Sequence, residues 1–469
     1  MTLETPVADG ERTRLLNALR SGQGAPEIVA TQAGEVLRRS WTREQTLLDV
    51  ARDELLAELL RTFAIFPDWL ERSITRRRLA LLFSQARDEL APLAASLAIQ
   101  CHLNEYAWNE DPEETRRVEA LTANLATLSP YEVMVLACYR PLSRLAGADA
   151  LLARGWDGPV REVLHEQIVA VREEAAIAAL LPALTPVTRE SSQAVQAQYE
   201  ANPYPRWRRA GSVPVVTHIR GRPVPRDMQM LIAGCGTGRH AVLSALSYPS
   251  SQTLAVDLSR TSLAYAVRKT RELGLDRRIT YAQADLMELD QEARYDMVQS
   301  TGVLHHMADT FEGARRVCRM VKPGGLVALG LYSAHARAAL EPARRIAKAY
   351  TPQTVRALRQ AILNLPHDDP ARAGVVSSRD FYTTSGCRDL LMHVQEHQHT
   401  IADLRRILDE NGLTFLGFAQ FDFRQVRDAY TARFPHDPAG LDLDAWDAFE
   451  AEHPGTFGRM YQFIAERRA

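Results

Sequence analysis

The stretch Met228–Gly238, which reads Met-Gln-Met-Leu-Ile-Ala-Gly-Cys-Gly-Thr-Gly, decides the fold. Its apolar run ends in three glycines at alternate positions, and Arg239–Leu243 then begins a helical pattern. A strand, a tight glycine turn and a helix in this order present backbone N–H groups to a ligand in an α/β sheet. Glycine is needed there because the turn visits positive φ and the ligand must approach the backbone closely.

Apolar runs after this stretch predict the remaining strands of the same sheet. They are Thr253–Asp257, Ile279–Gln283 followed by Ala284-Asp285, Tyr295–Ser300 followed by Gly302–His306, Leu326–Tyr332 after the turn Val321–Gly325, Thr414–Phe421 and Arg459–Glu466. Helical patterns at Ser259–Leu273, Phe311–Met320 and Thr400–Glu410 separate several of them. The sequence therefore predicts a seven-stranded, open, mostly parallel sheet with one antiparallel edge.

Five motifs in this order resemble those of the class I S-adenosylmethionine-dependent methyltransferases. They are Ala-Gly-Cys-Gly-Thr-Gly, Val-Asp-Leu-Ser, Gln-Ala-Asp-Leu, Gly-Val-Leu-His-His-Met and Val-Lys-Pro-Gly-Gly, all within residues 228–333. The chain is most similar to a bacterial subgroup with an all-helical N-terminal region before a Tyr-Glu-x-Asn-Pro-Tyr-Pro-Arg-Trp segment. This resemblance implies a Rossmann-like α/β domain that binds S-adenosylmethionine.

The resemblance also implies which residues bind the cofactor. They are Gly234, Cys235, Gly236, Gly238, Asp257, Leu258, Asp285, Leu286 and Ser300. Asp257 is expected to accept the ribose hydroxyls and Asp285 the adenine amino group. Each aspartate could instead cap a helix at a strand end, but their matched placement after consecutive strands favours cofactor binding.

One position departs from the family pattern. Relatives usually carry an acidic residue two positions before the first glycine, where it helps to hold the methionine end of the cofactor, and here that position is Ile232. We therefore expect another group to hold that end.

The segment Tyr199–Trp207 could supply the missing contact. Its prolines forbid a helix and fix an extended path. The segment could simply pack at a domain junction, or it could be a lid whose aromatic rings, from Tyr199 and Tyr204, cover the sulfonium while Arg206 meets a carboxylate. We favour the lid.

His305 and His306 follow the fourth strand, beside the switch point at which such sheets bind ligands. An imidazole that titrates near neutral pH is a suitable general base for removing a proton from a methyl acceptor. One member of the pair is expected to pack or to bond the backbone, and the motif does not say which one. We name His305 as the first candidate for the base.

A third histidine motif, His393-Val-Gln-Glu396-His397, matches the H-x-x-E-H pattern of inverted zinc peptidases. On a helix, His393 and His397 would share one face and could bind a metal. No third ligand is identifiable downstream, so we expect no metal. The alternatives are a polar wall of the acceptor pocket or a solvated helix end.

The chain is expected to contain three parts. Residues 1–190 read as helix after helix, with start signals at Asp68-x-x-Glu71, at Asp111-Pro112 and at the capping box Ser129–Glu132. Residues 191–226 form the hinge or lid segment. Residues 227–469 form the methyltransferase domain, with a helical insertion at about 334–398 in which Ser377–Cys387 is expected as a loop.

Composition excludes several other classes of protein. The chain has 469 residues, 46% of them hydrophobic and 24% charged, with a net charge of −2, so no overall field draws it to nucleic acid or to an anionic membrane. Its five cysteines form no Cys-x-x-Cys pair, and Met1–Leu15 has no apolar stretch typical of a secretion signal. We therefore expect a cytoplasmic protein with a small-molecule or peptide/protein acceptor, and we leave a homodimer open.

Two other functions remain open. Gly236-Thr-Gly238-Arg-His-Ala241 can be scored as the dinucleotide fingerprint of an NAD(P)-dependent oxidoreductase. The chain could also be a non-catalytic S-adenosylmethionine-binding regulator whose helical half serves interactions. The histidine pair argues against a regulator, because a sensor needs no base near the methyl group.

Overall fold

The computed structural model describes residues 9–41, 45–65 and 67–468, and the chain divides into two compact units. Unit 1 comprises Met1–Ala176, Pro205–Val213 and Pro342–Met392, and unit 2 comprises Ile177–Tyr204, Pro214–Glu341 and His393–Ala469. These bounds cross the three ranges expected from the sequence, because most of the helical insertion groups with the N-terminal helices and not with the sheet.

Unit 1 is built from helices. Their bounds are α1 Asp9–Ser21, α2 Pro26–Ser40, α3 Leu47–Ala51, α4 Glu54–Thr62, α5 Asp68–Phe83, α6 Arg87–Leu103, α7 Pro112–Thr122, α8 Pro130–Ala137, α9 Ala148–Leu152, α10 Pro159–Leu164, α11 Ala170–Leu180, α17 Glu341–Ala347, α18 Val355–Leu363, α19 Pro370–Val376 and α20 Thr384–Leu391. The capping box predicted at Ser129 is present, and the helix start predicted at Asp111 also carries a capping box. Each side chain accepts a backbone N–H of the first turn, which satisfies groups that a helix leaves without intrahelical partners.

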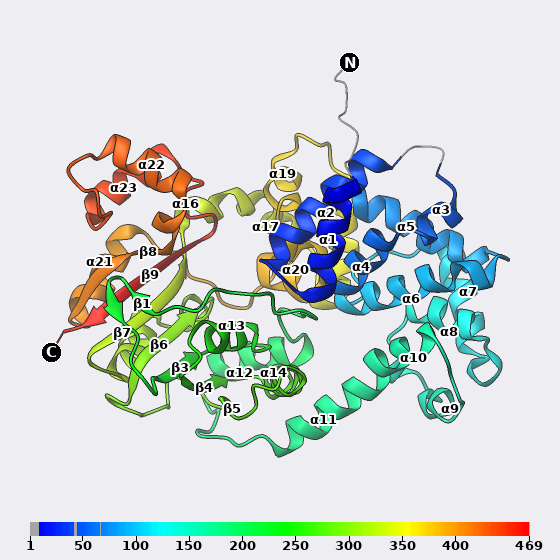
Figure 1. The fold of residues 1–469 in the computed structure, drawn as a ribbon, viewed down its shortest axis with the longest axis horizontal. Helices are drawn as coiled ribbons and strands as arrows, with labels where there is room; N and C mark the ends of the chain where they lie inside the picture. Colours follow the sequence, from blue (N-terminus) through cyan, green and yellow to red (C-terminus); the bar gives the residue numbers. More distant parts are fainter. Residues whose placement is uncertain (1–8, 42–44, 66, 469) are drawn as a thin grey trace. The chain divides into compact units, whose positions relative to one another are not determined.

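The helix α5 begins at Asp68 as predicted, but neither acid of its first turn caps it. Glu71 instead receives two hydrogen bonds from Arg359 of α18, at 2.7 and 2.9 Å, and Asp68 receives one from Arg372 of α19 at 2.7 Å. Figure 1 shows helices of the insertion, drawn in yellow, beside the blue N-terminal ones. The buried ion pairs explain why these distant segments form one unit.

The expected loop at Ser377–Cys387 is wrong. The structure has a 3₁₀-helix, η7, at Arg379–Tyr382 and the helix α20 from Thr384. The side chain of Thr383 accepts the N–H of Gly386 at 3.0 Å and so caps α20. The capping threonine was present in the sequence, but the serines, threonines and glycine around it read as a turn.

Unit 2 contains the predicted seven-stranded sheet, in the order β5-β4-β3-β6-β7-β9-β8. Its strands are β3 Gln229–Ala233, β4 Gln252–Asp257, β5 Ile279–Gln283, β6 Tyr295–Thr301, β7 Val321–Tyr332, β8 Leu413–Phe418 and β9 Met460–Arg467, and a separate hairpin pairs β1 His218–Ile219 with β2 Arg222–Pro223. The strands β3 to β7 pair in parallel, and β9 pairs antiparallel with both β7 and β8. This antiparallel end confirms the mixed sheet expected from the sequence.

Two strand boundaries differ from the prediction. The expected turn Val321–Gly325 lies inside β7, as an irregularity between the pairs Tyr295↔Val321 and Met297↔Leu326. The eighth strand ends at Phe418, before a 3₁₀-helix η8 at Ala419–Asp422. The expected turn is therefore an irregularity within one continuous strand, with ladder pairing on both sides of it.

Helices surround the sheet of unit 2 (Figure 1). They are α12 Glu190–Ala201, α13 Arg239–Ser247, α14 Arg260–Glu272, α15 Thr310–Arg319, α16 Ala334–Arg337, α21 Ile401–Glu410, α22 Arg424–Arg433 and α23 Leu443–Glu452, with the 3₁₀-helices η4 Leu304–His306 and η5 Ala338–Leu340. Leu231 and Ala233 share a buried cluster with residues of α15 and α21. Because strand side chains alternate, Met230 and Ile232 face the other side, where Gln299 links Met230 to Ser244 of α13.

Among the described residues, no helix combines the length and the apolar character that crossing a membrane requires.

Candidate functional site

The three glycines after β3 all adopt positive φ, between +51° and +81°, but they meet different neighbours. A Cβ on Gly234 would clash with the side chain of Val303, and one on Gly238 with Ala266. A Cβ on Gly236 would lie 2.8 Å from the main-chain oxygen of Tyr204. Gly234 and Gly238 thus allow internal packing, whereas Gly236 lets the segment before Pro205 approach the turn.

Asp257, at the end of β4, holds the glycine turn. Its Oδ2 accepts the N–H of Gly236 at 2.8 Å and its Oδ1 accepts the N–H of Ser259 at 2.9 Å. Burial raises the pKa of this carboxyl above its ordinary value, and the nearby charge of Glu200 acts in the same direction. Because a carboxylate can accept about four hydrogen bonds, Asp257 retains capacity for a further donor.

Glu200 is a residue of this region that the sequence did not single out. Its carboxylate accepts the N–H of Arg260 at 2.6 Å and that of Thr261 at 3.2 Å, at the start of α14. The side chain of Ser259 caps the same helix through Ser262. Glu200 thus fixes the helix that follows Asp257, and its place beside Tyr199 in the Tyr-Glu-x-Asn-Pro motif was the available signal.

Asp285 lies just after β5 and is buried. Its Oδ1 accepts the N–H of Met287 at 2.9 Å, whereas Oδ2 is buried without a hydrogen-bond partner among the described residues. A buried carboxylate oxygen without a partner is costly unless a ligand or water donates to it. Asp285 therefore offers an acceptor to a donor group at this edge of the sheet.

The other residues predicted near the cofactor make hydrogen bonds and packing contacts within the protein. Ser300 donates its hydroxyl to the oxygen of Ala233 at 3.1 Å, and the N–H of Cys235 donates to Val256 at 2.9 Å. The oxygen of Leu258 accepts the amides of Gln196 and Gln283, and Leu286 is buried in the core of unit 2. Burial raises the pKa of the Cys235 thiol well above its ordinary value, so this cysteine is a neutral packing group.

The three predicted lid residues make separate contacts. Tyr199 lies on α12, and its hydroxyl is 3.2 Å from Nε2 of His393. Tyr204 approaches Gly236 through its main-chain oxygen, as described above. Arg206 belongs to unit 1, where its Nε lies 3.6 Å from the carboxylate of Glu105.

His305, on η4, is completely buried. Its Nδ1 accepts the N–H of Tyr332 at 3.3 Å, and its ring stacks on that of Tyr332 with centroids 3.6 Å apart. Burial, reinforced by the neighbouring His306 and Arg337, lowers the pKa of His305 well below its ordinary value. The ring is therefore neutral at pH 7, with its proton on Nε2 and its lone pair directed at the backbone.

His306 differs from His305 at the same ring nitrogen. Its Nδ1 lies 2.8 Å from the main-chain oxygen of Gln395, which can only accept, so Nδ1 carries a proton. The ring stacks on that of His393, with centroids 3.6 Å apart and an interplanar angle of 18°. Both contacts come from the segment His393–His397, for which the zinc-peptidase pattern had suggested metal binding.

That pattern does not lie on a helix in the structure. The helix α20 ends at Leu391, and residues 393–398 have no regular secondary structure. Glu396 forms a buried ion pair with Arg337, and Nδ1 of His393 accepts the N–H of Gln395 at 3.0 Å. The helical spacing on which metal binding by His393 and His397 depended is therefore absent.

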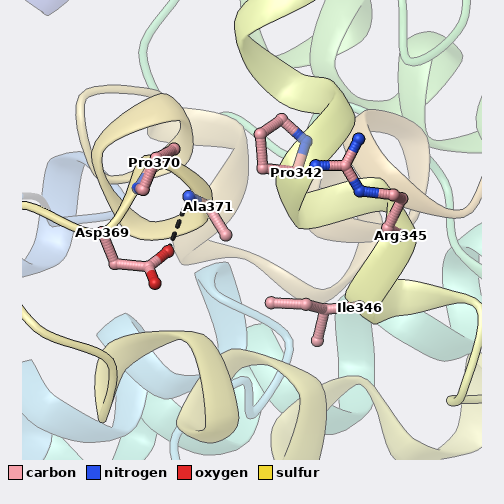
Figure 2. A pocket seen from close by; sticks show the side chains of 6 residues that line it. All are labelled: Pro342, Arg345, Ile346, Asp369, Pro370 and Ala371. Atoms are coloured by element: carbon pink, nitrogen blue, oxygen red, sulfur yellow. Dashed lines mark hydrogen bonds between the residues drawn. The ribbon is translucent and has the colours of Figure 1, made fainter.

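A cavity of about 550 Å³ lies in unit 1, between α17 and α19 (Figure 2). It is lined by Pro342, Arg345, Ile346, Asp369, Pro370 and Ala371. The carboxylate of Asp369 accepts the N–H of Ala371 at 2.8 Å and so caps α19. None of the residues predicted for the site lines this cavity.

Comparison with known proteins gives the class of the sheet domain. Residues 230–325 match the family described as a methyltransferase domain. Over 271 residues the chain is 28% identical to an uncharacterized protein of Synechococcus sp., covering 49% of this chain and 61% of that protein. It is 31% identical to 27-O-demethylrifamycin SV methyltransferase of Amycolatopsis mediterranei, covering 23% of this chain and 40% of that enzyme.

A third relative is the ribosomal protein uL3 glutamine methyltransferase of Bordetella pertussis, which is 41% identical over 75 residues, or 16% of this chain and 25% of that enzyme. The chain thus spans less than two thirds of the length of each of these relatives.

The fold, the glycine turn and the acids that follow it define a cofactor-binding α/β sheet of the methyltransferase type. The match over residues 230–325 and the mixed seven-stranded sheet support a class I S-adenosylmethionine-dependent methyltransferase domain. The cofactor of this class is S-adenosylmethionine, and the described residues fit it: Asp285 has a buried oxygen awaiting a donor, and Asp257 has acceptor capacity for a ribose. Ile232 is fully buried and apolar, so it gives the methionine end no polar contact.

Proposed function

We propose that this protein transfers the methyl group of S-adenosylmethionine to a nitrogen or oxygen nucleophile of a small molecule or of a peptide or protein side chain. One observation carries the proposal. The glycine turn, Asp257 and Asp285 follow three neighbouring parallel strands, β3, β4 and β5, and the carboxyl ends of parallel strands form the ligand-binding edge of an open sheet.

Each of these groups has a separate role in binding. Gly236 and its neighbours line the methionine and ribose of the cofactor, Asp257 accepts the ribose hydroxyls, and the unpartnered oxygen of Asp285 accepts the adenine amino group. Tyr199 and Tyr204, which belong to unit 2, remain the proposed source of the contacts that Ile232 does not make. The main-chain approach of Tyr204 to Gly236 supports this role for the segment.

The base that we propose is His306. A base needs a lone pair directed at its substrate, and in His305 the available lone pair accepts the backbone N–H of Tyr332. Burial also disfavours the charged form of His305. In His306 the main-chain oxygen of Gln395 engages Nδ1, and we propose that Nε2 takes the proton.

Every bond and proton of the proposed methyl transfer can be accounted for with these residues. The bound cofactor supplies a methyl group that is activated by a positive sulfur. The acceptor's lone pair forms the new bond to the methyl carbon, the carbon–sulfur bond breaks with its electron pair left on sulfur, and Nε2 of His306 takes the acceptor's proton. The protein must also align the nucleophile with the methyl group and exclude water.

The relatives support both classes of acceptor. One is named for a small molecule, a rifamycin, and another for a glutamine of a ribosomal protein. The protein's net charge of −2 gives no overall attraction to nucleic acid, so nucleic acid is not among the proposed acceptors. We place the reaction in the cytoplasm.

Two measurements test the proposal. Calorimetric titration with S-adenosylhomocysteine and with NAD should show binding of the first only, whereas binding of NAD alone would favour the oxidoreductase alternative. Incubation with methyl-labelled S-adenosylmethionine and cell lysate, followed by separation of protein from small molecules, should show label in one fraction. Tight S-adenosylhomocysteine binding without any transfer would instead favour the regulatory alternative.

A further inference from the structure

We infer that Glu200 and Thr185 are positioning residues of the cofactor site, Glu200 for Asp257 and Thr185 for Asp285. Both roles rest on the proposed function, in which these two acids bind the ribose and the adenine of S-adenosylmethionine. Both positioning residues lie in unit 2 and precede residues 230–325, which match the methyltransferase domain family. The cofactor site would then depend on chain outside the range that the family describes.

Glu200 closes the start of α14, the helix that follows Asp257. The N–H of Ser259 donates to Oδ1 of Asp257 at 2.9 Å. The next two N–H groups, those of Arg260 and Thr261, donate to the carboxylate of Glu200 at 2.6 and 3.2 Å. The first N–H groups of a helix have no partners within the helix, and an acid at that end also interacts favourably with the helix dipole. Glu200 therefore fixes the backbone to which one oxygen of Asp257 is bonded.

Further hydrogen bonds hold α12, the helix that carries Glu200, against the same turn. The hydroxyl of Thr261 donates to the main-chain oxygen of Glu200 at 3.2 Å. The side chain of Gln196 donates to the oxygen of Leu258 at 3.2 Å. Because residues four apart lie on one face of a helix, this face of α12 packs along the turn that follows Asp257.

Glu200 also acts on Asp257 through its charge. The titratable groups that face Asp257 include Glu200 of α12 and the thiol of Cys235 in the glycine turn. Burial raises the pKa of the Cys235 thiol well above its ordinary value, so the thiol stays neutral. Burial is also the main cause of the raised pKa of Asp257, and the negative charge of Glu200 adds to it. Removing that charge should lower the pKa of Asp257, which loss of a purely structural contact would not do.

Thr185 makes the corresponding contact with Asp285. Its hydroxyl oxygen accepts the N–H of Asp285 at 2.8 Å, and Asp285 is the residue whose Oδ2 is buried without a partner in the described part of the chain. The chain just before it pairs with the end of β5. The N–H of Gln283 donates to the oxygen of Pro182 at 2.9 Å, and the oxygen of Gln283 accepts the N–H of Leu184 at 2.8 Å. Main-chain pairing thus sets the position of Thr185, and Thr185 sets the backbone that carries the Asp285 carboxylate.

Arg260 connects the two positioning residues. Its N–H donates to Glu200, and its guanidinium bonds to the chain that leads to the pairing with β5. The guanidinium donates to the main-chain oxygens of Ala178 and Leu181, at 2.9 and 2.7 Å, and to the side chain of Gln283 at 3.1 Å. One residue at the start of α14 is therefore bonded to both supports, so the two cofactor-binding acids are held by one network.

The experiment for Glu200 is calorimetric titration of the full-length protein with S-adenosylhomocysteine at several pH values. Glu200→Gln should weaken binding at neutral pH by about 3–10-fold, the effect of losing one hydrogen bond. It should also move the loss of affinity at low pH to a lower pH, because Asp257 then keeps its charge further into the acid range. Unchanged affinity and unchanged pH dependence in a folded variant would overturn the role of Glu200.

Two further variants separate position from charge. Glu200→Asp keeps the charge on a side chain one methylene shorter, so it should weaken binding with less change in the pH dependence. Glu272→Gln is the matched control, because Glu272 ends the same helix and pairs with Arg268 and Lys269. The 13 residues of α14 place it roughly 20 Å from the start of the helix, beyond the Debye length of about 10 Å. It should change neither readout.

The experiment for Thr185 compares S-adenosylhomocysteine with S-inosylhomocysteine, in which an oxygen replaces the adenine amino group. The wild type should prefer the first ligand, because its amino group can donate to Asp285. Thr185→Val keeps the shape of the side chain but cannot accept the N–H of Asp285, so it should reduce this preference by about 3–10-fold. Thr185→Ser, which keeps the hydroxyl, should retain the preference.

Folded Glu200→Gln and Thr185→Val variants that match the wild type in affinity, pH dependence and ligand preference would overturn the inference. If Glu200→Gln does not fold, full affinity in Glu200→Asp would overturn the role of Glu200 equally. If the variants behave as expected but no acceptor is methylated, the positioning roles stand and the proposed transfer falls. If transfer occurs and none of the variants alters ligand binding, the proposed transfer stands and the positioning roles fall.

Discussion

Nδ1 of His306 donates a hydrogen bond to the main-chain oxygen of Gln395, a residue 89 positions later in the chain, at 2.8 Å. The neighbouring His305 has the reverse arrangement, because its Nδ1 accepts a backbone N–H from Tyr332. Nδ1 thus donates in one of the two adjacent histidines and accepts in the other. This difference is the reason that we propose His306 as the base.

His305→Phe tests the structural role assigned to His305. Phenylalanine keeps an aromatic ring against Tyr332 but leaves the N–H of Tyr332 without its acceptor. A buried donor that loses its partner costs about 1–3 kcal/mol, so urea unfolding should show a loss of that size. A variant as stable as the wild type would mean that this hydrogen bond contributes nothing.

Gly236→Ala tests the close approach of Tyr204 to the glycine turn. The matched control is Gly274→Ala, because both glycines have positive φ, +51° and +67°, but only at Gly236 would the new Cβ meet a neighbouring atom. Gly274→Ala should cost about 1–2 kcal/mol of unfolding free energy and leave S-adenosylhomocysteine binding intact. Gly236→Ala should weaken that binding as well, because Tyr204 must move.

Equal calorimetric affinities for the two variants would contradict this account of Gly236.

The raised pKa of Asp257 predicts how cofactor binding depends on pH. The charged carboxylate is the better acceptor for ribose hydroxyls, so affinity for S-adenosylhomocysteine should fall as the pH falls, beginning above the range of an ordinary carboxyl group of about 3.9. Asp257→Asn should bind more weakly, by about 1–3 kcal/mol, with little dependence on pH between about 4 and 7.

Protonation of Asp257 would not unfold the protein and so would not cause this loss of affinity at low pH indirectly. A carboxyl whose pKa is raised by folding destabilises the folded state as the pH rises through that pKa, and this destabilisation is relieved at lower pH. Calorimetry at several pH values measures the dependence, and a flat wild-type profile would mean that Asp257 does not contact the ligand through its charge.

The ion pair of Arg359 with Glu71 predicts that the insertion and the N-terminal helices unfold together. Both side chains are buried, and the guanidinium also donates to the oxygens of Ala107 and Phe381. Arg359→Met should cost about 3–5 kcal/mol, because it leaves a buried charge without its partner. The double variant Arg359→Met with Glu71→Gln should cost less than the two single changes added together.

The control for this prediction is the exposed pair of Arg20 with Glu54. Arg20→Met should change the free energy of unfolding by less than about 1 kcal/mol. If urea unfolding shows the same small change for Arg359→Met, the buried pair does not hold the segments together.

The sequence predicted the sheet well because its signals are local. Each strand from β3 to β6 is a short apolar run with a turn residue at its end, and the capping boxes at Asp111 and Ser129 each lie within four residues. Local patterns of this kind depend on backbone geometry and on hydrogen bonds between near neighbours. They therefore survive in a single sequence without knowledge of the fold.

The grouping of the chain into units depended instead on contacts between distant residues. Asp68 and Glu71 have the spacing of a capping box, but their carboxylates pair with Arg372 and Arg359, which lie hundreds of positions later. Nothing in the local pattern distinguishes a carboxylate that caps its own helix from one that binds a remote guanidinium. The same reason explains why the motif could not separate His305 from His306.

The measurement that tests the central claim most directly is the single-turnover rate of methyl transfer, from labelled S-adenosylmethionine to the acceptor identified in lysate, for the wild type, His306→Asn and His305→Phe. We expect His306→Asn to lower the rate by about 10²–10⁴-fold, the usual contribution of a general base, with its affinity for S-adenosylhomocysteine nearly unchanged. His305→Phe should keep a rate close to that of the wild type. A His306→Asn variant with the full rate, or a loss confined to His305→Phe, would contradict the account.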